Sequence, residues 1–234
     1  MKPIVTLTLN PSLDASSYAQ TIRPLHKIRT SEERYHPGGG GINVARVLLE
    51  LGGPAHALYL AGGPTGAVLD DLLALAGVPS ERVSIGGYTR VAHTVFERSS
   101  EQEYRFVPEG PEIGLDEWEH CLVALGKLDF DYVVASGSLP RGLPADAYRR
   151  VLDIAALKGA RVVLDTSGPV LAATLGQGVY LVKPSRGELE KLVGSPLPDI
   201  TSQTRAARDL IQVGQAEIVA VTSGGDGALI VSRD

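Results

Sequence analysis

The chain has 234 residues, of which 44% are hydrophobic and 21% are charged, and its formal net charge is -5. This composition is ordinary for a globular protein, and the negative charge gives no general attraction to nucleic acid or to an anionic membrane. Cys121 is the single cysteine, which excludes a disulfide framework and a cysteine zinc site, so a reducing, cytoplasmic setting is expected. We expect neither a signal peptide nor a membrane-spanning helix, because the N-terminus lacks a small-residue cleavage site and no apolar run approaches roughly 18 residues.

The first elements surround a run of four glycines. The stretch IVTLTL at residues 4–9 alternates apolar residues with threonine, which predicts a half-buried strand. A polar, extended segment at 22–35 follows, and then PGGGG leads directly into a helical pattern. Four consecutive glycines cost backbone entropy, so something must approach residues 38–41 too closely for side chains.

The helix after the glycines is amphipathic. Its predicted inward stripe is Val44, Val47, Leu48 and Leu51, which leaves Asn43 at the helix entrance on the polar face. An amide at that place can cap the helix or bind a hydroxylated ligand. The glycines do not make a nucleotide loop of known type, since no P-loop motif is present and the third glycine of the dinucleotide fingerprint would fall on Asn43 or Val44.

The middle of the chain contains a segment that does not fit a compact core. A helix is predicted at 66–78, closed by Gly77, and residues 89–107 form two alternating strands around a turn at 99–102. Together with 22–35, these strands indicate a lid over a site, an oligomerisation surface, or a plain edge hairpin.

The second half alternates strands and helices. Buried strands are predicted at 131–136, 160–165, 179–183 and 217–223, with helices starting at Pro144 and at Thr201, the latter with Ala206, Leu210 and Val213 facing inward. This alternation predicts a doubly wound, parallel α/β core. The strand ends read SGSLP, DTSG, KPSRGE and TSGGDG, and four polar, glycine-rich loops at one rim favour phosphate chemistry.

Five motifs in order and spacing, namely TLTLNPSLD, GGGGINVARVLLELGG, SGSLP, KPSRGELEKL and TSGGDGA, resemble the ribokinase-like (PfkB) carbohydrate kinases over essentially the whole chain. Within the phosphosugar branch, Gly40 stands where most members carry lysine, and this is similar to the minor 6-phosphofructokinases. The resemblance implies a ribokinase-like, doubly wound, mostly parallel sheet with helices on both faces and a small β lid. We expect a single domain over residues 1–234, with lid strands from about 14–36 and 88–108.

The resemblance implies ATP-dependent phosphorylation of a sugar phosphate, with ATP and Mg²⁺ as cofactors and a homodimer formed through the β lid. Fructose 6-phosphate, converted to fructose 1,6-bisphosphate, is the first expectation. The alternatives are tagatose-6-phosphate kinase or 1-phosphofructokinase activity, a non-catalytic sugar-phosphate binder, and an unstable fragment.

By resemblance, Asp14 and Asn43 bind sugar hydroxyls, while basic side chains on the lid hold the existing phosphate. An Asx turn is the alternative reading of Asp14. The full substrate set is Asp14, Lys27, Arg29, Gly39, Gly40, Gly41, Asn43, Arg90 and Ser138.

The implied nucleotide set is Lys183, Ser185, Glu188, Thr222, Gly224 and Gly227. Glu188 is expected to organise magnesium through water, which suits an ion that keeps most of its hydration shell. Ser185 replaces the asparagine of the family's N-x-x-E motif, and a single hydroxyl in place of an amide is expected to weaken ATP or metal binding.

The family's G-A-G-D signature, which supplies the catalytic base and an anion hole, does not occur in these residues. We therefore expect no catalytic residue in the chain, a C-terminally truncated kinase, and little or no activity of the polypeptide alone. Asp226 does not follow a glycine turn at a helix start, and Asp165 is expected at the wrong strand end to replace the missing base.

Overall fold

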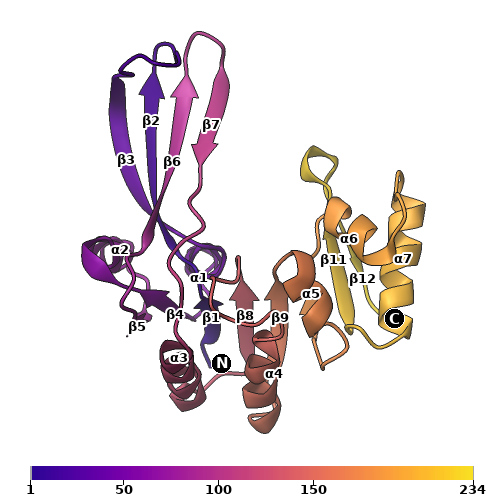
Figure 1. The fold of residues 1–234 in the computed structure, drawn as a ribbon. Coiled ribbons are helices and arrows are strands. Elements are labelled where there is room, and N and C mark those ends of the chain that lie inside the picture. Colours follow the sequence, from indigo (N-terminus) through magenta and orange to yellow (C-terminus); the bar gives the residue numbers. More distant parts are fainter. Residues whose placement is uncertain (1, 234) are drawn as a thin grey trace.

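The computed structural model describes residues 2–233 and contains an eight-stranded sheet (Figure 1). Its order is β12-β11-β10-β9-β8-β1-β4-β5, and all neighbours are parallel except β11 and β12. The strands are β1 (Ile4–Thr8), β4 (Ala55–Ala61), β5 (Ser80–Ser84), β8 (Tyr132–Ser136), β9 (Arg161–Asp165), β10 (Leu181–Val182), β11 (Ile218–Thr222) and β12 (Ala228–Val231). The predicted doubly wound, mostly parallel core is confirmed.

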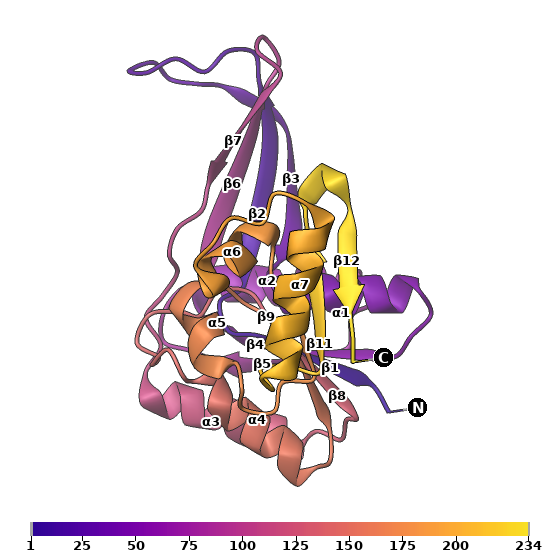
Figure 2. The same ribbon diagram turned by 90° about the vertical axis from the view of Figure 1, so that its right-hand side faces the viewer.

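Helices cover this sheet as two groups (Figure 2). On one face lie α1 (Gly40–Glu50) and α2 (Gly63–Leu75), and on the other α3 (Leu115–Lys127), α4 (Tyr148–Leu157), α5 (Gly168–Thr174), α6 (Arg186–Val193) and α7 (Ile200–Gln212). Over β9 to β11, the face on the α1 side is less covered, since Val163, Leu181 and Ala220 are only partly buried. Within residues 2–233, no helix has the length and apolar character required to cross a bilayer.

Strand β1 differs from its prediction because it lies in the middle of the sheet, between β8 and β4. A half-buried strand was expected, yet Thr6 and Thr8 are buried as completely as their apolar neighbours. Thr8 offsets part of the cost through its hydroxyl oxygen, which accepts a 3.0 Å hydrogen bond from the Ile42 amide at the start of α1.

Helix phases also differ from the predictions. On α1, Ile42 and Ala45 are buried, whereas Val47 and Leu51 are 52% and 79% exposed, so the predicted inward stripe was wrong at these last two positions. Leu48, a third member of the stripe, does pack against the core. Val213, expected to face inward, is 70% exposed just after the end of α7. The helix expected from Pro144 begins at Tyr148. A periodic pattern gives the existence of a helix more reliably than its rotation or its ends.

The lid is a separate four-stranded sheet that projects from the core (Figure 1). It contains β2 (Ser12–Ala19), β3 (Thr30–Gly38), β6 (Arg90–Glu97) and β7 (Gln102–Phe106), in the order β3-β2-β6-β7. β6 and β7 flank the predicted turn and form an antiparallel hairpin in which β7 is an edge strand. The hairpin joins the second sheet through the pairing of β6 with β2 and does not extend the main sheet.

Candidate active site

The glycine run lies against the carboxyl ends of β1 and β8, and the protein itself explains why it is bare. A Cβ at Gly40 would overlap Ser136 Oγ and lie 2.9 Å from the Gly137 nitrogen, while one at Gly41 would lie 2.9 Å from the Leu7 carbonyl oxygen. Gly39 has a φ of 123°, which few other residues adopt. The loop therefore packs tightly against the carboxyl ends of these central strands, and its backbone is the surface that a ligand can contact.

Asp14 lies inside β2, directly beside this loop. Its carboxylate accepts a 2.5 Å hydrogen bond from Ser12 Oγ, and a Cβ at Gly38 would overlap the same carboxylate. Because the residue belongs to a paired strand, the Asx-turn alternative was wrong. The geometry leaves an oriented carboxylate at the base of the lid.

Arg90 starts β6 at the same end of the lid, where Ser12 is its strand partner. Its guanidinium donates to the main-chain oxygens of Asn10 at 2.7 Å, Pro108 at 2.9 Å and Pro11 at 3.4 Å. Partial burial lowers the pKa of Arg90, and the nearby Asp14 carboxylate acts in the opposite direction. These bonds fix the plane of the guanidinium and leave it charged, since arginine stays protonated near neutral pH.

Ser138 and Asn10 complete this side of the site. Ser138 Oγ accepts from Arg90 Nη2 at 3.5 Å and from Asn10 Nδ2 at 3.1 Å. Asn10 is 5% exposed and was missed by the sequence analysis, although it lies in the TLTLNPSLD motif.

Asn43 lies in the first turn of α1, where its main-chain N–H donates to the Gly39 carbonyl oxygen at 2.9 Å. The N-cap is Gly39, so the reading of Asn43 as a helix cap was wrong. Its side chain is exposed beside the glycine loop and available to a ligand.

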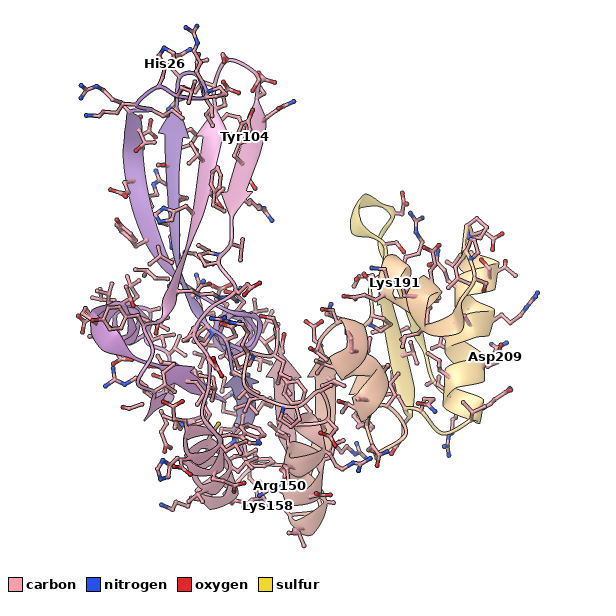
Figure 3. All side chains as sticks on the ribbon, viewed as in Figure 1. His26, Tyr104, Arg150, Lys158, Lys191 and Asp209 are labelled. Atoms are coloured by element: carbon pink, nitrogen blue, oxygen red, sulfur yellow. The ribbon has the colours of Figure 1, made fainter. Side chains whose placement is uncertain are left out.

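Lys27 and Arg29 are not brought to this site within one chain. They lie in the exposed loop after β2, at the far end of the lid, where Figure 3 labels the neighbouring His26. Ser12 pairs with Gly38 at the base and Ala19 pairs with Thr30 at the tip. Those seven residue steps along β2 correspond to roughly 23 Å, which is too far for a lysine or arginine side chain.

The candidate nucleotide residues gather at the carboxyl ends of β10 and β11. Ser185 is the N-cap of α6 and forms a capping box with Glu188: its amide donates to Glu188 Oε2 at 2.7 Å, and its hydroxyl donates to the same oxygen at 2.9 Å. Ser185 therefore orients the Glu188 carboxylate.

Thr222 is attached to this turn through its amide, which donates to the Pro184 carbonyl oxygen at 3.0 Å. Gly224 and Gly227 follow in a tight turn with φ values of 59° and 97°, and no protein atom lies within 4 Å of a Cβ built on either. Their open surroundings allow a ligand to approach the backbone.

Asp165 is the important residue that the sequence analysis misplaced. It ends β9 at the same rim, where it accepts from Ser136 Oγ at 3.0 Å and forms a 3.0 Å ion pair with Lys183. The expectation that it lies at the wrong strand end was wrong, because parallel strands place all their carboxyl ends together. The DTSG loop was itself the sequence signal.

A cavity of about 240 Å³ connects the two halves of the site. It is lined by Gly40, Ser136, Gly137, Ser138, Asp165, Thr166, Ser167 and Glu188. A larger cavity of about 460 Å³ lies beside it between α5 and α6, and Glu188 also lines that one. The smaller cavity is the one that links the glycine loop to the candidate nucleotide residues, because Gly40 and Glu188 both line it.

The acidic groups of this cavity fit a hydrated metal better than a direct protein cage. Among the described residues, no group of three or more histidine, cysteine or acidic side chains could hold a metal ion. Asp165 is already engaged by Ser136 and Lys183, and Oε2 of Glu188 by the capping box, so Oε1 of Glu188 is the oxygen left for an outer-sphere contact.

Comparisons with known proteins identify the family to which this fold belongs. The model of the pfkB family carbohydrate kinases matches residues 8–234. ATP-dependent 6-phosphofructokinase isozyme 2 of Mycobacterium tuberculosis is 46% identical over 98% of this chain and 68% of its own length. The crystal structure of Escherichia coli phosphofructokinase-2 with fructose-6-phosphate has a TM-score of 0.95 at 38% identity, covering 100% of this chain and 78% of that one. The tetrameric inhibited form of the same enzyme has a TM-score of 0.94, at 38% identity and with the same coverage.

Proposed function

The chain belongs to the pfkB family of carbohydrate kinases, and from this premise we propose that its sugar phosphate is fructose 6-phosphate, which the complete reaction converts with ATP to fructose 1,6-bisphosphate. The single observation that carries the proposal is the fixed arrangement of Arg90, Asp14 and Ser138 beside the bare Gly39–Gly41 backbone. A fixed guanidinium matches an anionic group, and the carboxylate and the Asn43 amide match neighbouring hydroxyls.

On the nucleotide side, we propose that Thr222, Gly224 and Gly227 lie along the ATP phosphates. The open glycine backbone can approach phosphate oxygens, and Lys183 adds positive charge at the adjacent strand end. Magnesium, when bound, would neutralise charge on those oxygens. Glu188, held by the Ser185 capping box, would receive hydrogen bonds from its water shell.

Residues 2–233 hold both ligands in this proposal but do not supply a free catalytic base. The cavity carboxylates are Asp165, which is bonded to Ser136 and Lys183, and Glu188, which is held at the start of α6. Phosphoryl transfer depends on positioning and electrostatics, and loss of one oxyanion-type donor alone costs about 3–4 kcal/mol. We therefore propose that the 234-residue chain binds fructose 6-phosphate with little or no turnover.

The test is calorimetry of the purified 234-residue chain with fructose 6-phosphate, tagatose 6-phosphate and fructose 1-phosphate, beside a coupled ATP assay. Saturable binding with preference for fructose 6-phosphate and no measurable turnover supports the proposal. Preference for another phosphosugar overturns the substrate assignment, and robust turnover overturns the inactivity. Aggregation without a cooperative melt would favour the unstable-fragment alternative.

We further propose a homodimer through the lid, in which the tip of one lid reaches the site of the other copy. Lys27 and Arg29 are out of reach of their own Gly39–Gly41 loop, and the lid face has a hollow of about 300 Å³ lined by residues that include Tyr18, His36 and Phe96. Light scattering coupled to size exclusion should give twice the mass of one chain. The buried Cys121 thiol fits a reducing compartment, so we place the protein in the cytoplasm.

A further inference from the structure

The tip of the lid contains a buried carboxylate with no role in the site described above. Glu97 ends β6 and is 5% exposed, although the turn residues 98–100 that follow it are exposed. The nearest guanidinium in sequence, Arg98, is paired with Glu32 at 2.6 Å. Within the described part of the chain, no lysine or arginine forms an ion pair with Glu97. A buried carboxylate must then be satisfied by neutral donors.

Those donors come from three separate segments. Oε1 accepts from the Ile22 amide at 2.6 Å and from Ser99 Oγ at 3.2 Å, while Oε2 accepts from Ser100 Oγ at 2.5 Å and from Tyr104 OH at 3.2 Å. Figure 3 labels Tyr104 on β7, below the tip. Glu97 thus joins the loop after β2, the β6–β7 turn and β7.

The Ile22 bond has a particular consequence because Ile22 begins the basic loop, which we define as residues 22–29. Main-chain bonds continue the pairing of β2 with β6 only as far as Gln20, whose carbonyl oxygen accepts from the Ser99 amide at 3.1 Å. Beyond that point, two further contacts hold the chain against the end of β6: Thr21 Oγ1 donates to Ser99 Oγ at 3.4 Å, and the Ile22 amide donates to the Glu97 carboxylate at 2.6 Å. The basic members of the loop are Arg23, His26, Lys27 and Arg29, and all four are exposed.

We propose that Glu97 is a positioning residue: its carboxylate fixes the start of the basic loop, so that Lys27 and Arg29 are presented to a sugar phosphate as a preformed cationic group. This inference rests on the proposed function for its ligand, but the tether itself does not. Preorganised cations lose less conformational entropy on binding than free side chains on a mobile loop. Glu97 touches no substrate; it acts through the Ile22 amide.

Limited trypsin digestion tests the tether, meaning the hydrogen bond between Glu97 and the Ile22 amide, because trypsin can cut a loosened loop after Lys27 and after Arg29. The Arg23–Pro24 bond resists trypsin. Glu97→Ala leaves the Ile22 amide without its partner, and loss of a hydrogen bond to a charged group shifts local opening by about tenfold. We expect cleavage after Lys27 to accelerate by about tenfold, while the protein still unfolds cooperatively.

Three further variants separate the tether from general damage. Glu97→Gln keeps an acceptor for Ile22, and the serine and tyrosine hydroxyls can accept from its amide, so cleavage should return to near the wild-type rate. Tyr104→Phe removes a donor that does not belong to the loop and should cleave like wild type. If Glu97→Ala does not fold, Glu97→Asp, which retracts the carboxylate by one methylene, should give the same acceleration.

Calorimetry with fructose 6-phosphate completes the test, with unphosphorylated fructose as the second titrant. Glu97→Ala should raise the Kd for fructose 6-phosphate several-fold and leave binding of fructose unchanged. Equal cleavage of wild type and Glu97→Ala, or equal acceleration in Tyr104→Phe, overturns the tether. Faster cleavage with an unchanged Kd overturns the positioning role. If wild type itself binds no fructose 6-phosphate, the proposed function fails, while the digestion still decides the role of Glu97.

Discussion

Alanine at position 40 tests whether the glycine loop is bare because of the protein. A Cβ there would lie 2.9 Å from the Gly137 nitrogen and would overlap Ser136 Oγ, closer than Cβ atoms normally approach. Gly137 is backbone with a φ of 114°, so it cannot move aside cheaply. Overpacking of this kind costs about 1–3 kcal/mol, and the lower entropy of unfolded alanine offsets about 0.4–1 kcal/mol. The net expectation for Gly40→Ala is a loss of about 1–2 kcal/mol.

Gly187→Ala is the matched control. Gly187 is the second residue of α6, exposed, with a helical φ and no protein atom within 4 Å of a built Cβ. The same substitution there should stabilise by about 0.5–1 kcal/mol.

Thermal unfolding followed by circular dichroism separates the two variants. For a chain of this size, 1 kcal/mol corresponds to about 2–4 °C, so Gly40→Ala should melt about 2–8 °C lower and Gly187→Ala about 1–4 °C higher. Gly40→Ala should also weaken fructose 6-phosphate binding, because the shifted loop no longer matches the ring. A Gly40→Ala protein with wild-type melting and wild-type affinity would refute the reasoning.

Three other predictions concern the sugar half, the nucleotide half and the lid tip. In Arg90→Lys, the lysine cannot form all the hydrogen bonds that the guanidinium makes to three main-chain oxygens, so the Kd for fructose 6-phosphate measured by calorimetry should rise about 10- to 100-fold. Arg105→Lys, at an exposed position of the lid, is the control and should leave this Kd unchanged. Gln203 is 7% exposed and bridges the Leu197 carbonyl oxygen and Ser223 Oγ at 3.3 Å each, so Gln203→Leu should weaken ATP binding and spare the sugar phosphate. Hydrogen bonds, the largest contribution from Ser100 and the next from Ile22, lower the pKa of Glu97. The stability that its carboxylate contributes is therefore present above the unfolded pKa of about 4.5 and is lost as the pH falls through the lower folded pKa. The difference in melting temperature between wild type and Glu97→Gln should shrink below about pH 4.5 and stay constant from pH 6 to 7.

The sequence by itself determined the fold class and the outline of the site. Continuous β-branched runs separated by helical patterns allow few arrangements other than a parallel sheet, because such strands must be buried on both faces. Since parallel strands end at one rim, the four polar loops had to converge there, and this predicted Ser138, Ser185 and Thr222 at the same rim of the sheet.

Only the tertiary structure decided which neighbours each residue meets. The glycine run predicts that something approaches its backbone closely. The structure shows that side-chain atoms of Thr8, Asp14 and Ser136 do so, and these residues are distant from the glycines in the sequence. Likewise, Asp165 belongs to the site and Lys27 lies at the far end of the lid, because strand order and register set those distances. Local pattern fixes period and burial; it carries no information about which strands become neighbours, and that is where the site is made.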